Sequence, residues 1–346
     1  MKDRIASSAA LALSLTVSMF AAAPARAEEA PAAGKPLRAG IIGLDTSHTV
    51  AFTKLLNDPK APAEVAGVRI VAAYPGGSKD VPSSWDRVPE YTKTLKETYG
   101  VEIVDSIDAL LEKVDVVLLE SVDGRPHLKQ AEPVFKAKKP MFIDKPVAGS
   151  LADAVAIYEM AKASGTPVFS SSALRFAPET LDARAGKLGA VAGCDAYSPC
   201  ALEEHHPDLF WYGVHGVEAL FTIMGTGCES VSRASTPGTD VAVGVWKGGR
   251  IGTFRGIRDG APHAYGATVF GAKKIGQAGG YAGYQPLVAE IVKFFKTGQA
   301  PVSPEETLEI FAFMEAADES KRQEGRPVTI ESVMAKARAE VASRGK

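Results

Sequence analysis

An almost uninterrupted apolar stretch, Val114 to Leu119 (VDVVLL), constrains the fold of this chain more than any other feature. A continuous apolar run of this length is typical of a central strand that is covered on both faces of a sheet. Further strands are predicted at 37–43, 68–74, 101–104 and 141–143, and helices between them at about 50–56, 91–99, 107–113 and 127–137. This alternation predicts a doubly wound parallel sheet with right-handed crossovers, as in Rossmann-like α/β domains.

The pattern changes after about residue 175. Two runs rich in β-formers, 241–247 and 250–255, flank Gly248-Gly249, which predicts a hairpin because glycine permits the positive φ of a tight turn. With a further strand at 266–271 and helices at 286–296 and 304–321, we expect an α+β domain with a mainly antiparallel, open sheet.

The length of 346 residues is enough for two domains, and 46% hydrophobic with 23% charged residues is ordinary globular composition. The 39 basic and 41 acidic side chains give a net charge of −2. A nucleic-acid partner is not expected, because the sequence has no excess of basic side chains that would bind phosphates.

The amino terminus reads as a targeting segment. Lys2 and Arg4 precede an apolar run to about Ala23, and Ala25-Arg26-Ala27 resembles a cleavage site. We therefore expect a Sec-type signal peptide over 1–27, a polar tether over 28–36, and a periplasmic or secreted protein with no membrane contact after cleavage. An uncleaved anchor helix is the competing interpretation.

Three cysteines, Cys194, Cys200 and Cys228, are too few for a disulfide framework. Cys194 and Cys200 could pair in an oxidising compartment. Isolated buried thiols are the interpretation that we favour.

The turn after the first predicted strand reads Gly43-Leu44-Asp45-Thr46-Ser47-His48. In a dinucleotide-binding turn, glycines let the backbone approach a pyrophosphate at a helix N-terminus. Here Asp45 replaces the second glycine and His48 the third. A carboxylate facing a pyrophosphate is repulsive, so this turn by itself is a poor match.

Six segments, taken together, resemble the Gfo/Idh/MocA oxidoreductases, which include glucose-fructose oxidoreductase and inositol dehydrogenases. Residues 40–43 resemble the family's first strand and turn, and 114–127 its fourth strand and the following loop. Residues 142–146 resemble its Glu-Lys-Pro signature with Asp in place of Glu, and 174–176 the entry to the second domain. Residues 213–215 resemble the catalytic-histidine segment and 304–328 the C-terminal helix, and all six segments follow the family's order and spacing.

This resemblance implies a Rossmann-like domain over 37–172, a substrate and oligomerisation domain over 173–300, and C-terminal helices over 301–346 that pack back on the first domain. It also implies oxidation or reduction of a sugar or polyol hydroxyl with NAD or NADP. Lys145 and His215 take the catalytic roles, because hydride leaves carbon only as the hydroxyl proton is removed. Lys145 also follows an apolar strand at the sheet's carboxyl edge, where ligands bind.

Two sets of further site residues follow from the resemblance and from sequence position. Expected near the cofactor are Gly43, Asp45, Thr46, Ser47, His48, Glu120, His127, Asp144, Lys145 and Pro146. Expected near the substrate are Arg175, His206, Asp208, Trp211 and Tyr212. His127 could equally be a buried or helix-capping histidine, and Trp211, which stands where the family has Asp, could form a sugar platform or belong to the core.

A metal is not expected. A weaker alternative places a Zn²⁺-like ion among His206, Asp208, His215 and Glu218, and Asp45 with His48 raises the same question. A polar rim without metal is the simpler interpretation.

Three functions therefore remain open. The first is an exported oxidoreductase whose cofactor is retained and recycled, since Sec-type export moves unfolded chains. The second is a non-redox or metal-assisted enzyme acting on carbohydrate, and the third is a carbohydrate-binding protein with a degenerate nucleotide site. The open sheet would suit a homo-oligomer.

Overall fold

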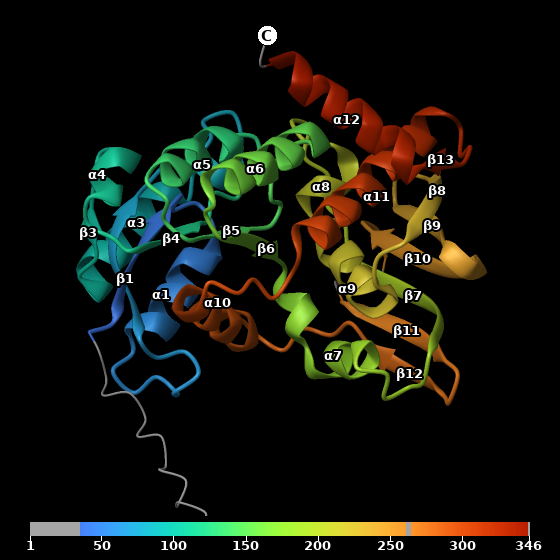
Figure 1. Cartoon of the computed structure of the whole chain (residues 1–346), viewed down its shortest axis with the longest axis horizontal. Coiled ribbons are helices and arrows are strands. Elements are labelled where there is room, and N and C mark those ends of the chain that lie inside the picture. Colours follow the sequence, from blue (N-terminus) through green and yellow to red (C-terminus); the bar gives the residue numbers. More distant parts are fainter. Residues whose placement is uncertain (1–34, 261–263, 345–346) are drawn as a thin grey trace, which may run out of the picture. The chain divides into compact units, whose positions relative to one another are not determined.

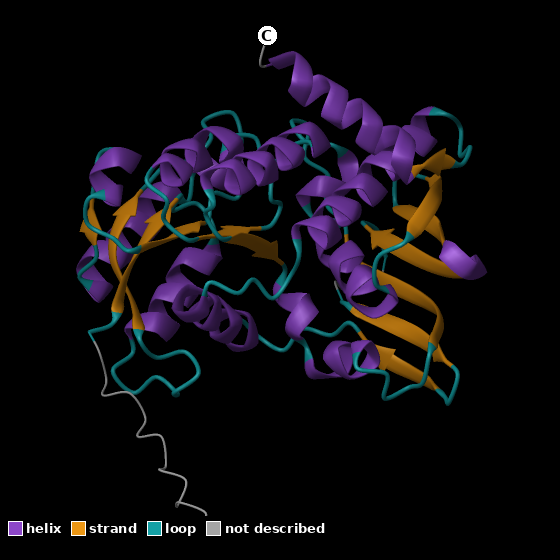
Figure 2. Ribbon diagram, viewed as in Figure 1, coloured by secondary structure: helices purple, strands orange, loops and turns teal. Residues whose placement is uncertain are grey.

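The computed structural model describes residues 35–260 and 264–344, and the chain from Lys35 onward forms one compact unit. Two β-sheets with their helices make up this unit (Figures 1 and 2). The predicted signal peptide, and the predicted tether as far as residue 34, lie outside the described residues. Within the described part, no helix combines the length and the apolar character needed to cross a bilayer.

The first sheet confirms the doubly wound parallel fold. Its six strands lie in the order β3-β2-β1-β4-β5-β6, and every neighbouring pair is parallel. They are β1 (Leu37–Ile42), β2 (Val68–Tyr74), β3 (Glu102–Ile103), β4 (Val116–Leu119), β5 (Met141–Asp144) and β6 (Val168–Ser171). The apolar stretch forms β4, which is fully buried between β1 and β5. The sixth strand, β6, was not predicted.

Helices cover both faces of this sheet. They are α1 (Ser47–Asn57), α2 (Pro82–Trp85), α3 (Val88–Tyr99), α4 (Ile107–Leu111), α5 (His127–Lys136) and α6 (Leu151–Ser164). Side chains of α4, α5 and α6 join the hydrophobic cluster on one face, and side chains of α1 and α3 join the cluster on the other.

The helix α10 (Gln285–Thr297) falls inside the segment predicted as the second domain, yet it packs on the first. Its Leu287 and Ile291 belong to the same cluster as Ile41 of β1 and Phe52 of α1. Figure 1 shows α10 beside α1. The boundary predicted at residue 300 therefore does not separate two packing units, because the apolar side of α10 completes the core of the parallel sheet.

The second sheet is mixed but mainly antiparallel, as predicted. Its seven strands lie in the order β12-β11-β7-β10-β9-β8-β13, and only β7 and β10 pair in parallel. They are β7 (Val191–Pro199), β8 (Cys228–Ser235), β9 (Thr239–Trp246), β10 (Arg250–Ile257), β11 (Gly266–Gly271), β12 (Ile275–Ala278) and β13 (Val328–Thr329).

The β9–β10 hairpin was predicted with a two-residue loop, and the structure corrects this. Trp246 pairs with Arg250, so three residues, Lys247–Gly249, form the connection. Gly248 and Gly249 both have φ of 79°, which is the conformation that favoured glycine there.

The remaining helices lie against the second sheet or connect the two sheets. They are η1 (Ala173–Phe176), α7 (Pro178–Arg184), α8 (Asp208–Trp211), α9 (Val214–Met224), α11 (Pro304–Arg322) and α12 (Ile330–Arg344). Both α11 and α12 contact α6 of the first domain as well as β8 of the second. The chain's end therefore contacts both domains.

All three cysteines are buried free thiols, in agreement with the favoured interpretation. Burial raises the pKa of each thiol to about 12.

Candidate functional site

A cavity of about 290 Å³ lies at the carboxyl ends of the parallel strands. Its lining comes from the segments after β1, β2, β4, β5 and β6 and from the second domain. The lining residues are Thr46, Ser47, His48, Arg87, Val122, Lys145, Ala173, Tyr212, His215, Tyr265, Tyr281 and Tyr284. A parallel sheet brings its carboxyl ends to one edge, so this is where such a fold binds ligands.

Lys145 and His215 both line this cavity. Lys145 directly follows β5 and is only 7% exposed. His215 is the second residue of α9, and its ring lies edge-on to Tyr212 with a centroid distance of 5.1 Å. The two residues, 70 positions apart, are thus presented to one small volume.

The His215 imidazole is held neutral. Burial lowers its pKa well below the usual value, and the positive charge of Lys145 acts in the same direction. Its Nδ1 lies 2.8 Å from Ser172 Oγ, at the start of η1. When Nδ1 donates its proton to Ser172, the lone pair of Nε2 is free to accept a proton.

Asp45 does not face the cavity, which corrects the repulsion expected from the sequence. Its carboxylate is fully buried and accepts hydrogen bonds from Ser84 Oγ at 2.6 Å and from the Val122 N–H at 3.0 Å. Burial raises its pKa. The carboxylate is therefore turned into the protein, and it leaves the beginning of α1 accessible from the cavity.

Gly43, at the start of the same turn, has a φ of 92°. A Cβ there would lie 2.5 Å from the backbone nitrogen of Ser121. Glycine is needed because the β1 turn passes directly against the loop after β4.

The cavity fits the nicotinamide and phosphate end of a dinucleotide. Ser47, the first residue of α1, is exposed, and Arg87 lines the same space. A helix N-terminus and a guanidinium both stabilise a phosphate. Lys145 lies at the end of β5, within reach of a group bound beside His215.

The segment 78–87, which follows β2, is held against the loop after β4 by side-chain contacts. Ser78 Oγ donates to Asp123 at 2.6 Å, and Asp80 accepts two bonds from Arg125 at 2.8 and 2.9 Å. Ser84 holds Asp45, as described above. We call residues 78–87 the strap, because it ties the end of β2 to the loop after β4. The adenosine end of a dinucleotide would lie near the end of β2, next to the strap.

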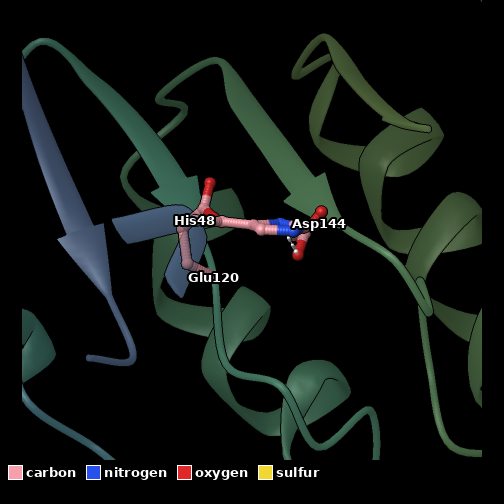
Figure 3. Close-up of side chains that lie close together, drawn as sticks. All are labelled: His48, Glu120 and Asp144. Atoms are coloured by element: carbon pink, nitrogen blue, oxygen red, sulfur yellow. Dashed lines mark hydrogen bonds and ion pairs between the residues drawn. The ribbon is translucent and has the colours of Figure 1, made fainter. Parts of the chain in front are cut away.

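A compact polar cluster lies beneath the cavity (Figure 3). His48 Nδ1 is 2.7 Å from Asp144 Oδ2, and Glu120 lies close to both. Glu120 and Asp144 are buried, and neither lines the cavity. Pro146, also predicted near the cofactor, is buried directly after Lys145.

His127 takes the buried position that the sequence left open. It is fully buried, with its ring nitrogens 2.8 Å from the Ser121 carbonyl oxygen and 3.2 Å from that of Val147. Burial lowers its pKa. It braces the loop after β4 and does not line the cavity.

Of the five residues expected near the substrate, only Tyr212 lines the cavity. Arg175 is 2% exposed and is paired with Glu218 at 2.5 Å and Glu306 at 2.8 Å. Its guanidinium is therefore engaged in joining η1 to α9 and α11.

The other three also lie outside the cavity lining. Asp208 pairs with Arg233 at 2.9 Å and with Lys321 at 2.6 Å. His206 lies between Glu203 and Asp123, at 2.8 and 2.9 Å, and Trp211 packs against its ring.

The same contacts separate the alternative metal set. Each of its members has a different partner: His206 contacts Asp123, Asp208 contacts Arg233, Glu218 contacts Arg175 and His215 contacts Ser172. No cation site forms among these four described side chains.

Sequence reasoning missed Ser172, Arg87 and three tyrosines of the cavity wall. Tyr265 is 3.2 Å from Tyr212 through their hydroxyls, and the rings of Tyr281 and Tyr284 pack against each other. The aromatic pair in Tyr281-Ala282-Gly283-Tyr284, set among glycines, was the available signal. Aromatic side chains on a glycine-rich loop are typical of a ligand-facing wall.

Comparison with known proteins agrees with the fold. Residues 37–172 match the sequence model of the Gfo/Idh/MocA family, described as an oxidoreductase family with an NAD-binding Rossmann fold. This confirms the resemblance expected from the sequence. No curated protein matches the chain in sequence.

Solved structures share the fold over most of the chain. Scyllo-inositol dehydrogenase from Lactobacillus casei, solved with NAD(H) and scyllo-inositol, has a TM-score of 0.71 at 15% identity and covers 86% of this chain and 100% of its own. Myo-inositol 2-dehydrogenase from Lactobacillus plantarum has 0.69 at 15%, covering 85% and 99%. A probable dehydrogenase from Thermotoga maritima has 0.68 at 22%, covering 86% and 100%.

Proposed function

We propose that this protein transfers hydride between NAD or NADP and a carbon that bears a hydroxyl group, because residues 37–172 match the sequence model of the Gfo/Idh/MocA oxidoreductase family. The proposed substrate is a sugar or polyol. Two of the structural neighbours are inositol dehydrogenases, and one of them was solved with NAD(H) and scyllo-inositol. The wall of hydroxyl-bearing tyrosines is suited to a compact polyol.

In the oxidising direction, His215 accepts the proton of the substrate hydroxyl at Nε2. The imidazole is available as a base because burial and Lys145 keep it neutral. Ser172 fixes the ring through Nδ1 and stabilises the imidazolium that forms. The nicotinamide, when bound, accepts or supplies the hydride.

Lys145 donates a hydrogen bond to the oxygen that loses its proton. Its charge stabilises the developing alkoxide, and the surrounding rings exclude water, which strengthens that interaction. Lys145 can stabilise the alkoxide because it is enclosed as well as charged. The single observation that carries the proposal is that Lys145 and a neutral His215 line one enclosed cavity.

The test is a turnover assay of the purified protein with NAD and NADP against inositols, aldoses and their reduced polyols. Product is followed by nicotinamide absorbance and by mass spectrometry of the sugar. We expect turnover with at least one polyol, and a loss of about 10²- to 10⁴-fold in kcat for His215→Ala and for Lys145→Ala.

Lys187→Ala serves as the control, because this lysine is exposed, pairs with Asp182 and lies outside the cavity lining. Full activity in His215→Ala would overturn the catalytic assignment. Sugar binding of unchanged affinity in both active-site variants, without turnover in the parent, would indicate a binding protein instead.

A second candidate function is favoured by the strap, which is bonded to Asp45, Asp123 and Arg125 beside the end of β2, where the adenosine of a dinucleotide would lie. A cofactor trapped there could be reduced and reoxidised within one turnover, so that the net reaction is an epimerisation or an elimination without net redox change. Co-purified nucleotide, with product formed and no change in free NADH, would identify this closed cycle.

We also propose that the chain is exported. The support is that residues 1–27 begin with basic residues, continue with an apolar run and end in small residues that resemble a cleavage site. Amino-terminal sequencing of the protein from a bacterial periplasm or culture medium should begin at Glu28. A cytoplasmic protein that begins at Met1 would contradict export.

A further inference from the structure

In a buried acidic pair beneath the cavity, Glu120 and Asp144, three of the four carboxylate oxygens lack hydrogen-bond partners among the described residues. Neither carboxylate oxygen of Glu120 has a partner within the described structure, and Asp144 Oδ1 has none. Glu120 is 0% exposed and Asp144 is 1% exposed. An unpartnered carboxylate in this environment is strongly unfavourable, so each such atom calls for a specific explanation.

The fold brings one potential ligand atom from each of His48, Glu120 and Asp144 close together. Glu120 follows β4, Asp144 ends β5, and His48 lies in the first turn of α1, directly after β1. Because β1, β4 and β5 are neighbours in the sheet, their carboxyl ends converge. One nitrogen or oxygen from each residue lies within 4.8 Å of the others, and Figure 3 shows the side chains directed toward one another.

The charge of this group is unbalanced. Two buried carboxylates face one lysine, Lys145, while Asp45 adds a third acid nearby. Charges removed from water are tolerated when they are paired or when they coordinate a metal. One divalent cation would partner the orphaned oxygens and compensate their charge.

From this geometry we propose that His48, Glu120 and Asp144 bind a divalent first-row transition-metal cation. An imidazole with two carboxylates suits Zn²⁺, Mn²⁺ or Co²⁺, whereas Ca²⁺ and Mg²⁺ prefer oxygen ligands alone. The His48 ring is already fixed, since it stacks on Phe52 with a centroid distance of 5.5 Å and lies edge-on to Tyr284 at 4.7 Å.

Binding requires a small contraction. Metal–ligand distances of about 2.0–2.2 Å place the ligand atoms of a four-coordinate ion about 3.5 Å apart. The longest separation therefore closes by about an ångström, and the His48–Asp144 hydrogen bond is exchanged for two metal bonds. His48 also lines the cavity, so the remaining coordination position would be adjacent to a bound substrate. This differs from the sequence expectation that no metal is present, and its residues differ from the alternative set.

The test measures metal binding directly and does not depend on the proposed redox function. The purified protein is stripped with a chelator, and Zn²⁺, Mn²⁺ and Co²⁺ are added back separately. We expect one equivalent by elemental analysis, a metal-dependent rise in the unfolding temperature, and visible Co²⁺ bands that report mixed nitrogen and oxygen ligands.

Variants identify the ligands. Glu120→Gln and His48→Gln should each weaken metal affinity by about 100-fold or more, judged by competition with a chromophoric chelator. Glu120→Gln replaces a buried carboxyl group without a hydrogen-bond partner at constant shape, so the stripped variant should unfold at the same temperature as the stripped parent or higher. That result would separate loss of a ligand from loss of the fold.

Two controls match the substituted residues. His206→Gln changes another buried histidine that lies between carboxylates, and Glu309→Gln changes a half-buried acid that accepts backbone N–H groups. Both should keep full stoichiometry. Absence of stoichiometric metal under all three additions, or equal binding by Glu120→Gln and the parent, would overturn the proposal. In that case the Glu120 side chain would be buried in its protonated, uncharged form.

Discussion

The properties of His215 illustrate how the chemistry of one residue is set by its surroundings. An isolated imidazole is half-protonated near neutral pH. Here burial and the nearby Lys145 charge both disfavour the protonated form, so the pKa lies well below 6.5. The base is consequently ready to accept a proton at neutral pH, and Ser172 keeps it correctly oriented.

This coupling predicts a change in pH dependence. In the parent, kcat/KM should fall on the acid side only at a pH well below 6.5, as His215 becomes protonated. Lys145→Met removes a positive charge, so the pKa of His215 should rise toward 6.5 and the acid limb should move to higher pH. The pH profile of the residual activity measures this shift.

Lys187→Met provides the control for that experiment, because Lys187 is exposed and pairs with Asp182 away from the cavity. Its profile should match the parent. An acid limb that stays in place in Lys145→Met would mean that His215 is not the base that limits the rate.

At the scale of elements, a buried ion-pair network joins three helices around Arg175. The guanidinium in η1 bonds Glu218 in α9 and Glu306 in α11, and all three side chains are at least nine-tenths buried. Since α9 carries His215 and η1 follows Ser172, this network fixes the spacing of the catalytic elements. The resemblance suggested a substrate role for Arg175, but its contacts are structural.

Arg175→Met should therefore lower stability strongly. Removing the cation leaves the buried Glu218 carboxylate without a cationic partner, whereas Glu306 keeps its pair with Arg184. Loss of one partner of a buried ion pair typically costs about 3–5 kcal/mol of unfolding free energy. Urea unfolding followed by circular dichroism measures the loss. Arg38→Met, whose exposed pair with Asp115 is screened by solvent and should contribute little to stability, is the matched control. A comparable loss in both variants would refute this account of the network.

The strap gives a second prediction at this scale. Arg125 holds Asp80 and Asp123, so Arg125→Ala should loosen residues 78–87. Hydrogen exchange in this segment should become faster, and NAD should associate several-fold faster in stopped-flow fluorescence. Lys136→Ala, which removes an exposed pair on α5, should change neither. Unchanged exchange in Arg125→Ala would mean that this ion pair does not hold the strap in place.

For the whole molecule, the second sheet has one face without helices among the described residues. The helices α9 and α11 pack on the opposite face (Figure 2). Val245 and Ile251, cross-strand partners in β9 and β10, are 37% and 52% exposed, and Ile275 in β12 is 64% exposed. We propose that this face associates with a second copy of the chain.

Ile251→Lys tests this association. A buried charge in an isologous contact appears twice, so the variant should dissociate to monomers in light scattering after size exclusion. Leu202→Lys alters an apolar residue of similar exposure outside the strands and should leave the mass unchanged. A monomeric parent would contradict the proposal outright.

The sequence by itself determined the alternation of β1 to β5 with α1, α3, α4 and α5, because periodicity and glycine positions act over a few residues. The central strand β4, the helix after the first strand and the glycine hairpin were all visible in this way. The order of matching segments also made Lys145 and His215 candidates. Local patterns could not reveal the packing of α10 on the first sheet.

Only the tertiary structure decided where the polar side chains point. Asp45 was expected to face a phosphate and turns inward to Ser84, whereas Glu120 and Asp144 meet His48 across three strands. Whether a charged group is repulsive, paired or available to a ligand depends on neighbours that are distant in sequence. Those neighbours are set by how the strands and helices pack, since Coulomb energies and desolvation act through space rather than along the chain.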